Sequence, residues 1–177
     1  MATLFTHAVV AIAAGNVFAR RQMRLSFWVL SILCAVLPDV DVIGFYLGVP
    51  YDHFFGHRGF THSLLFAAVW GFLVASFIFR DVEGGSHPWL LRWVYFSAVT
   101  ASHGALDAMT NGGFGVAFYS PFDPTRFFFT WRPIEVAPIG VEAGLSEWGL
   151  QILLSELVYV WTPMIVLLLL VREVREK

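Results

Sequence analysis

Apolar residues are concentrated in five segments of the chain, which polar stretches separate. The segments cover approximately residues 4–19, 25–49, 62–80, 89–109 and 148–171. A helix needs ~20 predominantly apolar residues to cross a bilayer, and most of the segments approach that length. The pattern therefore predicts an all-α protein, an integral membrane bundle of about five transmembrane helices that forms one domain over residues 1–177.

The second segment is interrupted by a polar sequence around Pro38, Asp39 and Asp41. Because proline disfavours a continuing helix, we expect the helix to end or kink before Pro38. A helix from residue 25 to this break rises only ~20 Å, which is less than the ~30 Å hydrocarbon core of a bilayer. Both aspartates should therefore lie below the far membrane surface, and their carboxylates would point the same way only in an extended chain.

The composition strengthens the membrane assignment. Hydrophobic residues make up 58% of the chain, charged residues 14%, and the mean hydropathy is +0.69. Soluble domains contain ~25% charged residues. The net charge of −2 indicates no basic surface for nucleic acid. The single cysteine, Cys34, excludes an internal disulfide and a cysteine-based metal cluster.

The basic residues predict the orientation of the bundle. Eight of the eleven lie in the loops after the first and third segments and in the C-terminal tail: Arg20, Arg21, Arg24, Arg80, Arg92, Arg172, Arg175 and Lys177. The positive-inside rule makes this side cytoplasmic. The N-terminus, the loop around residues 50–60 and a long loop at about 110–147 then face the extracytoplasmic side.

Histidine and aspartate residues gather at the extracytoplasmic ends of the predicted helices. The candidate metal ligands are His7, Asp39, Asp41, His57, His62, His103 and Asp107. His103 and Asp107 are four residues apart, so they share one helical face. Gly59 and Thr61 indicate a turn before the third helix, with Thr61 as its N-cap. Mixed imidazole and carboxylate ligands predict one or two divalent ions, Zn²⁺ first, with Mn²⁺ or Fe²⁺ as alternatives.

Some polar residues are candidates for roles in catalysis. Asp41, His62 and Asp107 are catalytic candidates, and Asp107 is the best candidate for a ligand that bridges two ions. Glu156 is a candidate ligand, general base or partner of an arginine. A phosphate group could be bound by the arginines of the predicted outer side, namely Arg58, Arg126 and Arg132.

The chain contains the motifs TH near the N-terminus, LPDVD, HRGFTHS, SHGALDAMTNGG, SPF and WRPIEVAPIG. Together these motifs resemble those of the LexA-regulated, membrane-bound, predicted metal-dependent hydrolase family. The resemblance covers nearly the whole chain. It implies a distant similarity to the helical core of zinc-dependent phospholipase C and to the fungal single-strand nucleases, whose ligands follow the order His, Asp, His and His-x-x-x-Asp. The residues that match this order are His7, Asp39 or Asp41, His57 or His62, and His103 with Asp107. No histidine follows His103, which argues against the third metal of those enzymes.

These features predict a hydrolase of the cytoplasmic (inner) membrane of a prokaryote, which cleaves a lipid phosphoester with metal-activated water. Membrane lipid would be both its environment and its substrate, no nucleic acid would bind, and the oligomeric state is left open. The alternatives are a lipid amidase with the same site and a non-enzymatic membrane protein that binds or transports metal. The outer arginines favour a phosphoester over an amide.

Overall fold

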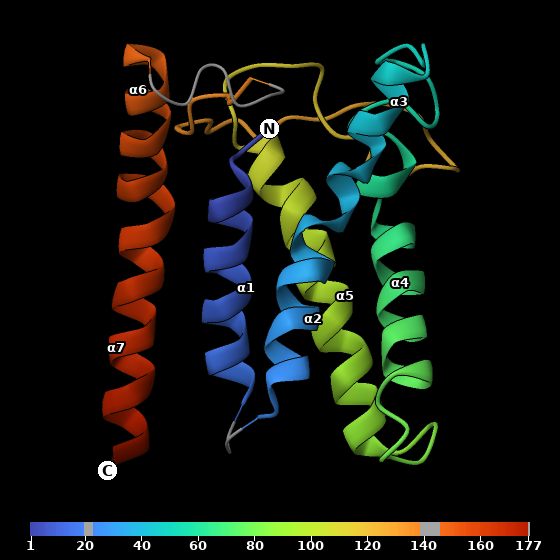
Figure 1. Cartoon of the computed structure of the whole chain (residues 1–177), viewed down its shortest axis with the longest axis vertical. Helices are drawn as coiled ribbons and strands as arrows, with labels where there is room; N and C mark the ends of the chain where they lie inside the picture. The colour runs from blue at the N-terminus through green and yellow to red at the C-terminus, as the bar shows by residue number, and fades with distance from the viewer. Residues whose placement is uncertain (20–22, 139–145, 177) are drawn as a thin grey trace.

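The computed structural model describes residues 1–19, 23–138 and 146–176. These residues form helices and irregular segments, and no strand occurs within the described ranges. Long helical rods stand side by side, with the N-terminus near one end of the bundle and the C-terminus at the other (Figure 1). Arg20, Arg21, residues 139–145 of the predicted outer loop and Lys177 lie outside the described residues.

The rods correspond to the five apolar segments. The first is α1 (Leu4–Phe18), and the second joins α2 (Leu25–Val36), the 3-10 helix η1 (Leu37–Val42) and α3 (Ile43–Tyr46). The 3-10 turn η2 (Phe60–His62) precedes α4 (Leu64–Phe77) and α5 (His87–Ala108). The last rod joins α6 (Glu147–Glu156), the π-helical turn η3 (Leu157–Trp161) and α7 (Thr162–Glu176). The all-α prediction is confirmed for the described residues.

Two of the rods are long and apolar enough to cross a membrane. They are Leu25–Tyr46, with 22 residues, and Glu147–Glu176, with 30 residues. The α1 and α4 helices have 15 and 14 residues. Helices of that length rise only about 20 Å, which is less than the ~30 Å hydrocarbon core. The structure therefore supports a helical bundle with two candidate spans, and five crossings remain a prediction.

Ser63, rather than the expected Thr61, is the N-cap of α4. Its side chain accepts a hydrogen bond from the Phe66 N–H at 3.0 Å. The Thr61 hydroxyl instead donates to a carboxylate oxygen of Asp41 at 2.7 Å. Because α4 begins only after this cap, His62 stays in η2, where its side chain can face α5.

One cluster of buried apolar side chains packs α2, α4 and α5 together next to the polar residues of the site. Its buried members include Phe27 and Cys34 on α2, Phe96 and Val99 on α5, and Val74 on α4. This core packs the helices together and leaves the polar side chains gathered near the N-terminal end of α1.

The segment from residue 109 to residue 138 covers that end of the bundle (Figure 1). Val116 and Phe127 exchange backbone hydrogen bonds of 2.9 Å in both directions, and the Ala137 N–H donates to the Met1 carbonyl at 2.9 Å. The side chains of Val116 and Ile134 are wholly buried. Most of the predicted outer loop is therefore a packed cover over the site.

Candidate metal centre

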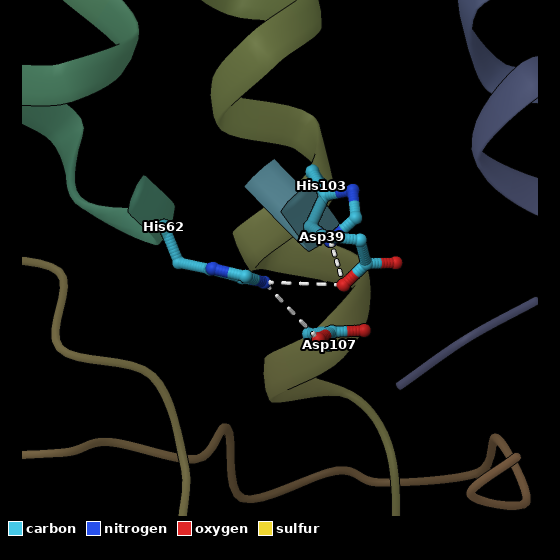
Figure 2. Close-up of side chains that lie close together, drawn as sticks. All are labelled: Asp39, His62, His103 and Asp107. Carbon is cyan, nitrogen blue, oxygen red and sulfur yellow. Dashed lines mark ion pairs between the residues drawn. The ribbon is translucent and has the colours of Figure 1, made fainter. Parts of the chain in front are cut away.

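The site is assembled from three parts of the chain that are distant in sequence. Asp39 comes from η1, His62 from η2, and His103 and Asp107 from α5. Figure 2 shows these four side chains pointing toward one another. Each offers one nitrogen or oxygen atom, and these four atoms all lie within 4.8 Å of one another. All four side chains are buried, so the predicted convergence of these ligand types is confirmed.

The two aspartates of η1 separate because the chain is helical there. Pro38 lies in the first turn of η1, and α2 has ended at Val36, as the sequence predicts. In a 3-10 helix of about three residues per turn, side chains two positions apart point in different directions. Asp39 accordingly faces His103, whereas Asp41 faces His57. The extended arrangement, with both carboxylates pointing the same way, is not formed.

The pair formed by His103 and Asp39 carries the clearest chemical signal. Nδ1 of His103 lies 2.6 Å from the Ala35 carbonyl oxygen, which can only accept, so this nitrogen holds the ring proton. In the neutral ring Nε2 is then an acceptor, yet it lies 3.2 Å from Oδ1 of Asp39. Two acceptors at this distance need an added proton or a metal ion between or beside them.

His62 has the same arrangement of one held and one free nitrogen. Its Nδ1 lies 3.1 Å from Oδ2 of Asp41. Its Nε2 lies 3.6 Å from Oδ1 of Asp39 and 3.6 Å from Oδ2 of Asp107. A carboxylate that holds one imidazole nitrogen while the other faces a cation is the usual setting of a zinc-binding histidine. Figure 2 marks the two longer contacts of Nε2 with dashed lines.

Asp41 is saturated by protein donors. One oxygen accepts from His57 Nδ1 at 2.8 Å, and the other accepts from the Arg58 N–H at 3.1 Å and the Thr61 hydroxyl at 2.7 Å, with His62 Nδ1 also near it. This carboxylate therefore orients two imidazole rings. Asp41, His57 and His62 also form a second group with metal-ligand spacing, so the role of Asp41 as a ligand or catalytic group stays a prediction.

Asp107 is held by two donors on opposite sides. Its Oδ1 accepts from the Ala2 N–H at 2.8 Å, and its Oδ2 lies 3.0 Å from Nε of Arg58. Arg58 is wholly buried, and its terminal nitrogens donate to the Gly112 carbonyl and the Thr110 hydroxyl at 3.0 Å. The expectation that Arg58 faces a substrate phosphate does not agree with this setting. The residue also has a φ of 62°, a conformation that is uncommon for a side chain other than glycine.

His7 lies at the edge of the cluster. Its ring stacks on His103, with the centroids 3.7 Å apart, and its Nε2 is 3.9 Å from Oδ1 of Asp107. Both ring nitrogens are buried without a hydrogen-bond partner. His7 is not part of either group with metal-ligand spacing. The structure therefore brings it to the site at a greater distance than the other predicted ligands.

Glu156 is outside the cluster and has a different role from the one predicted. Its two oxygens accept from the N–H and the hydroxyl of Thr3 at 2.5 and 2.6 Å. Thr3 is the N-cap of α1, so the wholly buried carboxylate ties the end of α6 to the start of α1. Because these bonds occupy both oxygens, the structure does not support Glu156 as a ligand or general base.

The other two outer arginines have separate positions. Arg126 donates to the carbonyls of His57 at 2.8 Å and Tyr51 at 3.0 Å, so it fastens the 51–57 loop. Burial raises the pKa of the Tyr51 phenol, while the charge of Arg58 opposes the shift. Arg132 is exposed, with its guanidinium 4.7 Å from the ring centre of Phe128. Of the three predicted phosphate-binding residues, Arg132 has the most accessible side chain.

The residues present fit a divalent cation. Several ligand-type atoms of these residues are buried without a hydrogen bond, namely both oxygens of Asp39, Nε2 of His62 and His103, and Oδ2 of Asp107, which has only its ion pair with Arg58. Unpaired buried polar atoms are costly, so such a group is expected to have a partner. The cluster holds three carboxylates, Asp39, Asp41 and Asp107, and one guanidinium, Arg58, so negative charge is in excess if the imidazoles are neutral. A divalent ion would offset this excess.

Several residues that shape the site were missed from the sequence. The Ala35 carbonyl fixes the His103 ring, and backbone acceptors give no sequence signal. Gly104 allows close packing, since a Cβ there would lie 2.9 Å from the His62 carbonyl oxygen. A glycine directly after a candidate histidine was a visible signal of this contact. Thr61, which was assigned to a cap, instead donates a hydrogen bond to Asp41.

The helical fold, the apolar outer surface and the buried histidine–aspartate cluster define a membrane protein with a candidate metal centre. The chain belongs to the YdjM inner membrane protein family, whose model matches residues 1–176. It is also similar to the inner membrane protein YbcI of Escherichia coli (strain K12), with 38% identity over 164 residues, 92% of each chain. No solved structure matches it significantly. These relatives indicate an inner-membrane location; neither name states an activity, so the LexA-regulated hydrolase assignment remains a prediction.

Proposed function

We propose that this protein is a metal-dependent hydrolase that cleaves a phosphoester in the headgroup of a membrane lipid. The observation that carries the proposal is the buried set of unbonded donor atoms on Asp39, His62, His103 and Asp107. Imidazole and carboxylate donors in this arrangement suit Zn²⁺, with Mn²⁺ or Fe²⁺ as alternatives. The second group, which shares His62, leaves room for one or two ions.

The bound ion would supply a water of lowered pKa and would polarise the phosphoryl oxygen. The protein's part is to hold and orient the ligands. Asp41 keeps the His62 ring turned toward the centre, and the Ala35 carbonyl does the same for His103. Arg58 holds Asp107 from the side and offsets part of the negative charge of the cluster. This rigid arrangement requires little reorganisation when charge develops in the transition state.

The depth of the site favours a lipid substrate. The α2 helix has 12 residues and therefore rises only ~18 Å before Asp39 and Asp41 follow in η1. If the rods cross the membrane with the charge asymmetry described above, the cluster lies on the extracytoplasmic side but below the surface. A lipid headgroup reaches this depth from within the leaflet more readily than a soluble polymer does.

Two observations separate this proposal from its alternatives. Arg132, exposed on the same end of the bundle, offers a guanidinium to a phosphate, which favours a phosphoester over an amide bond. Transport would require polar groups to continue through the bundle. The core beneath the site is instead mainly apolar, and its buried polar groups, such as Ser31, Tyr95 and Thr100, form hydrogen bonds within it.

The proposal is tested with purified, Zn²⁺-loaded protein in detergent and a panel of phospholipids, polyprenyl phosphate and amide-linked lipids. We expect release of phosphate or a phosphorylated headgroup that stops when chelator is added. Asp107→Asn should abolish release, whereas Asp52→Asn, a change at an exposed aspartate of the outer loop, should not. Equal release by Asp107→Asn, or release that chelator does not affect, would contradict the proposal. Release of fatty acid from amide-linked lipids would support the amidase alternative instead.

A further inference from the structure

A large apolar cavity lies beside the candidate metal centre. Its volume is about 880 Å³, within the ~300–1,000 Å³ range of pockets that hold small molecules. It runs along α2 and η1, and α1, α4 and α6 contribute further walls. Among the described residues that line it, Asp39 has the only charged side chain. The cavity therefore meets the cluster at Asp39, and the rest of its wall offers contacts for an apolar molecule.

The part of the cavity below Asp39 matches one leaflet in length. The lining follows the second rod from Tyr46 to Leu30, and its deeper part runs from Asp39 to Leu30. Seven residues of α-helix and two of 3-10 helix separate these positions, which corresponds to a rise of ~15 Å. Half of the ~30 Å hydrocarbon core is also ~15 Å. A hydrocarbon chain that lies in this cavity would therefore extend from the cluster to about the middle of the bilayer.

The cavity is open at its side. Leu33, Val40 and Tyr46 line it and are also exposed, with 53%, 48% and 82% of their surfaces accessible. They belong to Leu25–Tyr46, and the cavity residue Ile152 belongs to Glu147–Glu176, the two rods that qualify as membrane spans. A molecule already dissolved in the bilayer can therefore reach the cavity laterally, without crossing the aqueous phase.

We propose that this cavity binds one hydrocarbon chain of the substrate lipid and thereby places its headgroup phosphate beside Asp39. The inference rests on the proposed function, because it takes the bound molecule to be the substrate. A helix from a second copy is a weaker occupant, because it would cover Asp39, whose two oxygens have no hydrogen bond, without a compensating charge.

Photo-crosslinking tests the proposal independently of hydrolysis. The probe is phosphatidylethanolamine with a diazirine at the end of one palmitoyl chain, incorporated with the full-length protein into phosphatidylethanolamine–phosphatidylglycerol nanodiscs. After irradiation, mass spectrometry should locate most of the label on deep cavity residues such as Leu30 and Trp70. Leu169 and Leu170 of α7, which are exposed and are not part of the cavity lining, serve as the internal reference. Even labelling of both sets would overturn the proposal.

A substitution that narrows the cavity gives a second measurement. Leu33→Trp places a larger side chain in the lining at an exposed position, so we expect cavity labelling to fall at least several-fold. Leu91→Trp on α5, 45% exposed and outside the lining, is the matched control and should label as the wild type does. Labelling that Leu33→Trp leaves unchanged would contradict the proposal. If a second copy fills the cavity of the wild-type protein, its cavity will not be labelled and crosslinked dimers will appear, which would overturn the proposal.

The two proposals can fail separately. Cavity labelling without chelator-sensitive hydrolysis would contradict the proposed function and support the lipid site. Hydrolysis by a protein whose cavity is not labelled would support the function and overturn the inference.

Discussion

Replacing Asp41 by asparagine tests the division of the cluster into metal ligands and a carboxylate that positions them. In the structure one oxygen of Asp41 serves His57, and the other serves Arg58, Thr61 and His62. An asparagine has one oxygen and one NH₂ group, so it can satisfy only one of these sides. We expect its oxygen to face the side with three donors, which leaves the Nδ1–H of His57 opposite another donor.

The expected loss is moderate. His62 would be held by a neutral amide oxygen instead of a carboxylate, and removing such a supporting group typically lowers metal affinity ~10–100-fold. This factor corresponds to ~1.4–2.8 kcal/mol of binding free energy. His103→Ala, which removes a donor atom itself, should lower the affinity much further. Asp52→Asn, at an exposed position of the outer loop, should leave the affinity unchanged.

The assay is competition for Zn²⁺ between the purified protein and a chromophoric chelator in detergent. Circular dichroism of each variant shows whether the helical fold is retained. If Asp41→Asn loses Zn²⁺ as completely as His103→Ala does, Asp41 is a ligand and the positioning role is wrong. If its affinity equals that of the wild type, the hydrogen bonds to His57 and His62 do not support the site.

Two further predictions rest on single contacts, and a third rests on the charge asymmetry of the bundle. Gly104→Ala brings a methyl group to 2.9 Å from a backbone oxygen of η2, so we expect the free energy of unfolding to fall by ~1–3 kcal/mol and Zn²⁺ binding to weaken. Gly84→Ala, with open space around it, is the control and should leave thermal unfolding unchanged. Glu156→Gln should lower the free energy of unfolding by ~1–3 kcal/mol, because one oxygen that accepts from the start of α1 is lost. A large fall in turnover number with unchanged stability would instead support a catalytic role for Glu156. In intact cells a membrane-impermeant thiol reagent should label Phe55→Cys but not Gly84→Cys, and the reverse pattern would invert the orientation.

The helices could be predicted from the sequence because long apolar segments and Pro38 act locally. The position of the break was correct to within a residue or two, since proline disfavours a helical conformation just before it. The number of membrane crossings could not be settled in the same way. The lengths of α1 and α4 fall between those of a span and those of a core helix.

The composition of the site was also predictable, because the helix ends that carry its histidines and aspartates all lie at one end of the bundle. The roles within it were not. Arg58 looked like a free cation in sequence, but its left-handed backbone turns the side chain inward to Asp107. Asp39 and Asp41 are two residues apart, and only the 3-10 geometry of η1 shows that they serve different partners. Glu156 depends on a contact 153 residues away.

The most direct test of the account is the Zn²⁺ stoichiometry of the purified chain. It is measured by titrating metal-free protein and by elemental analysis after removal of loosely bound ions. The account predicts one or two ions per chain in the wild type and almost none in the His103→Ala, Asp107→Ala double variant. His87→Ala, a change at the first residue of α5 and outside the cluster, should retain full loading. A double variant that still binds the full complement, or a folded wild-type protein that binds none, would contradict the assignment of this cluster as a metal centre.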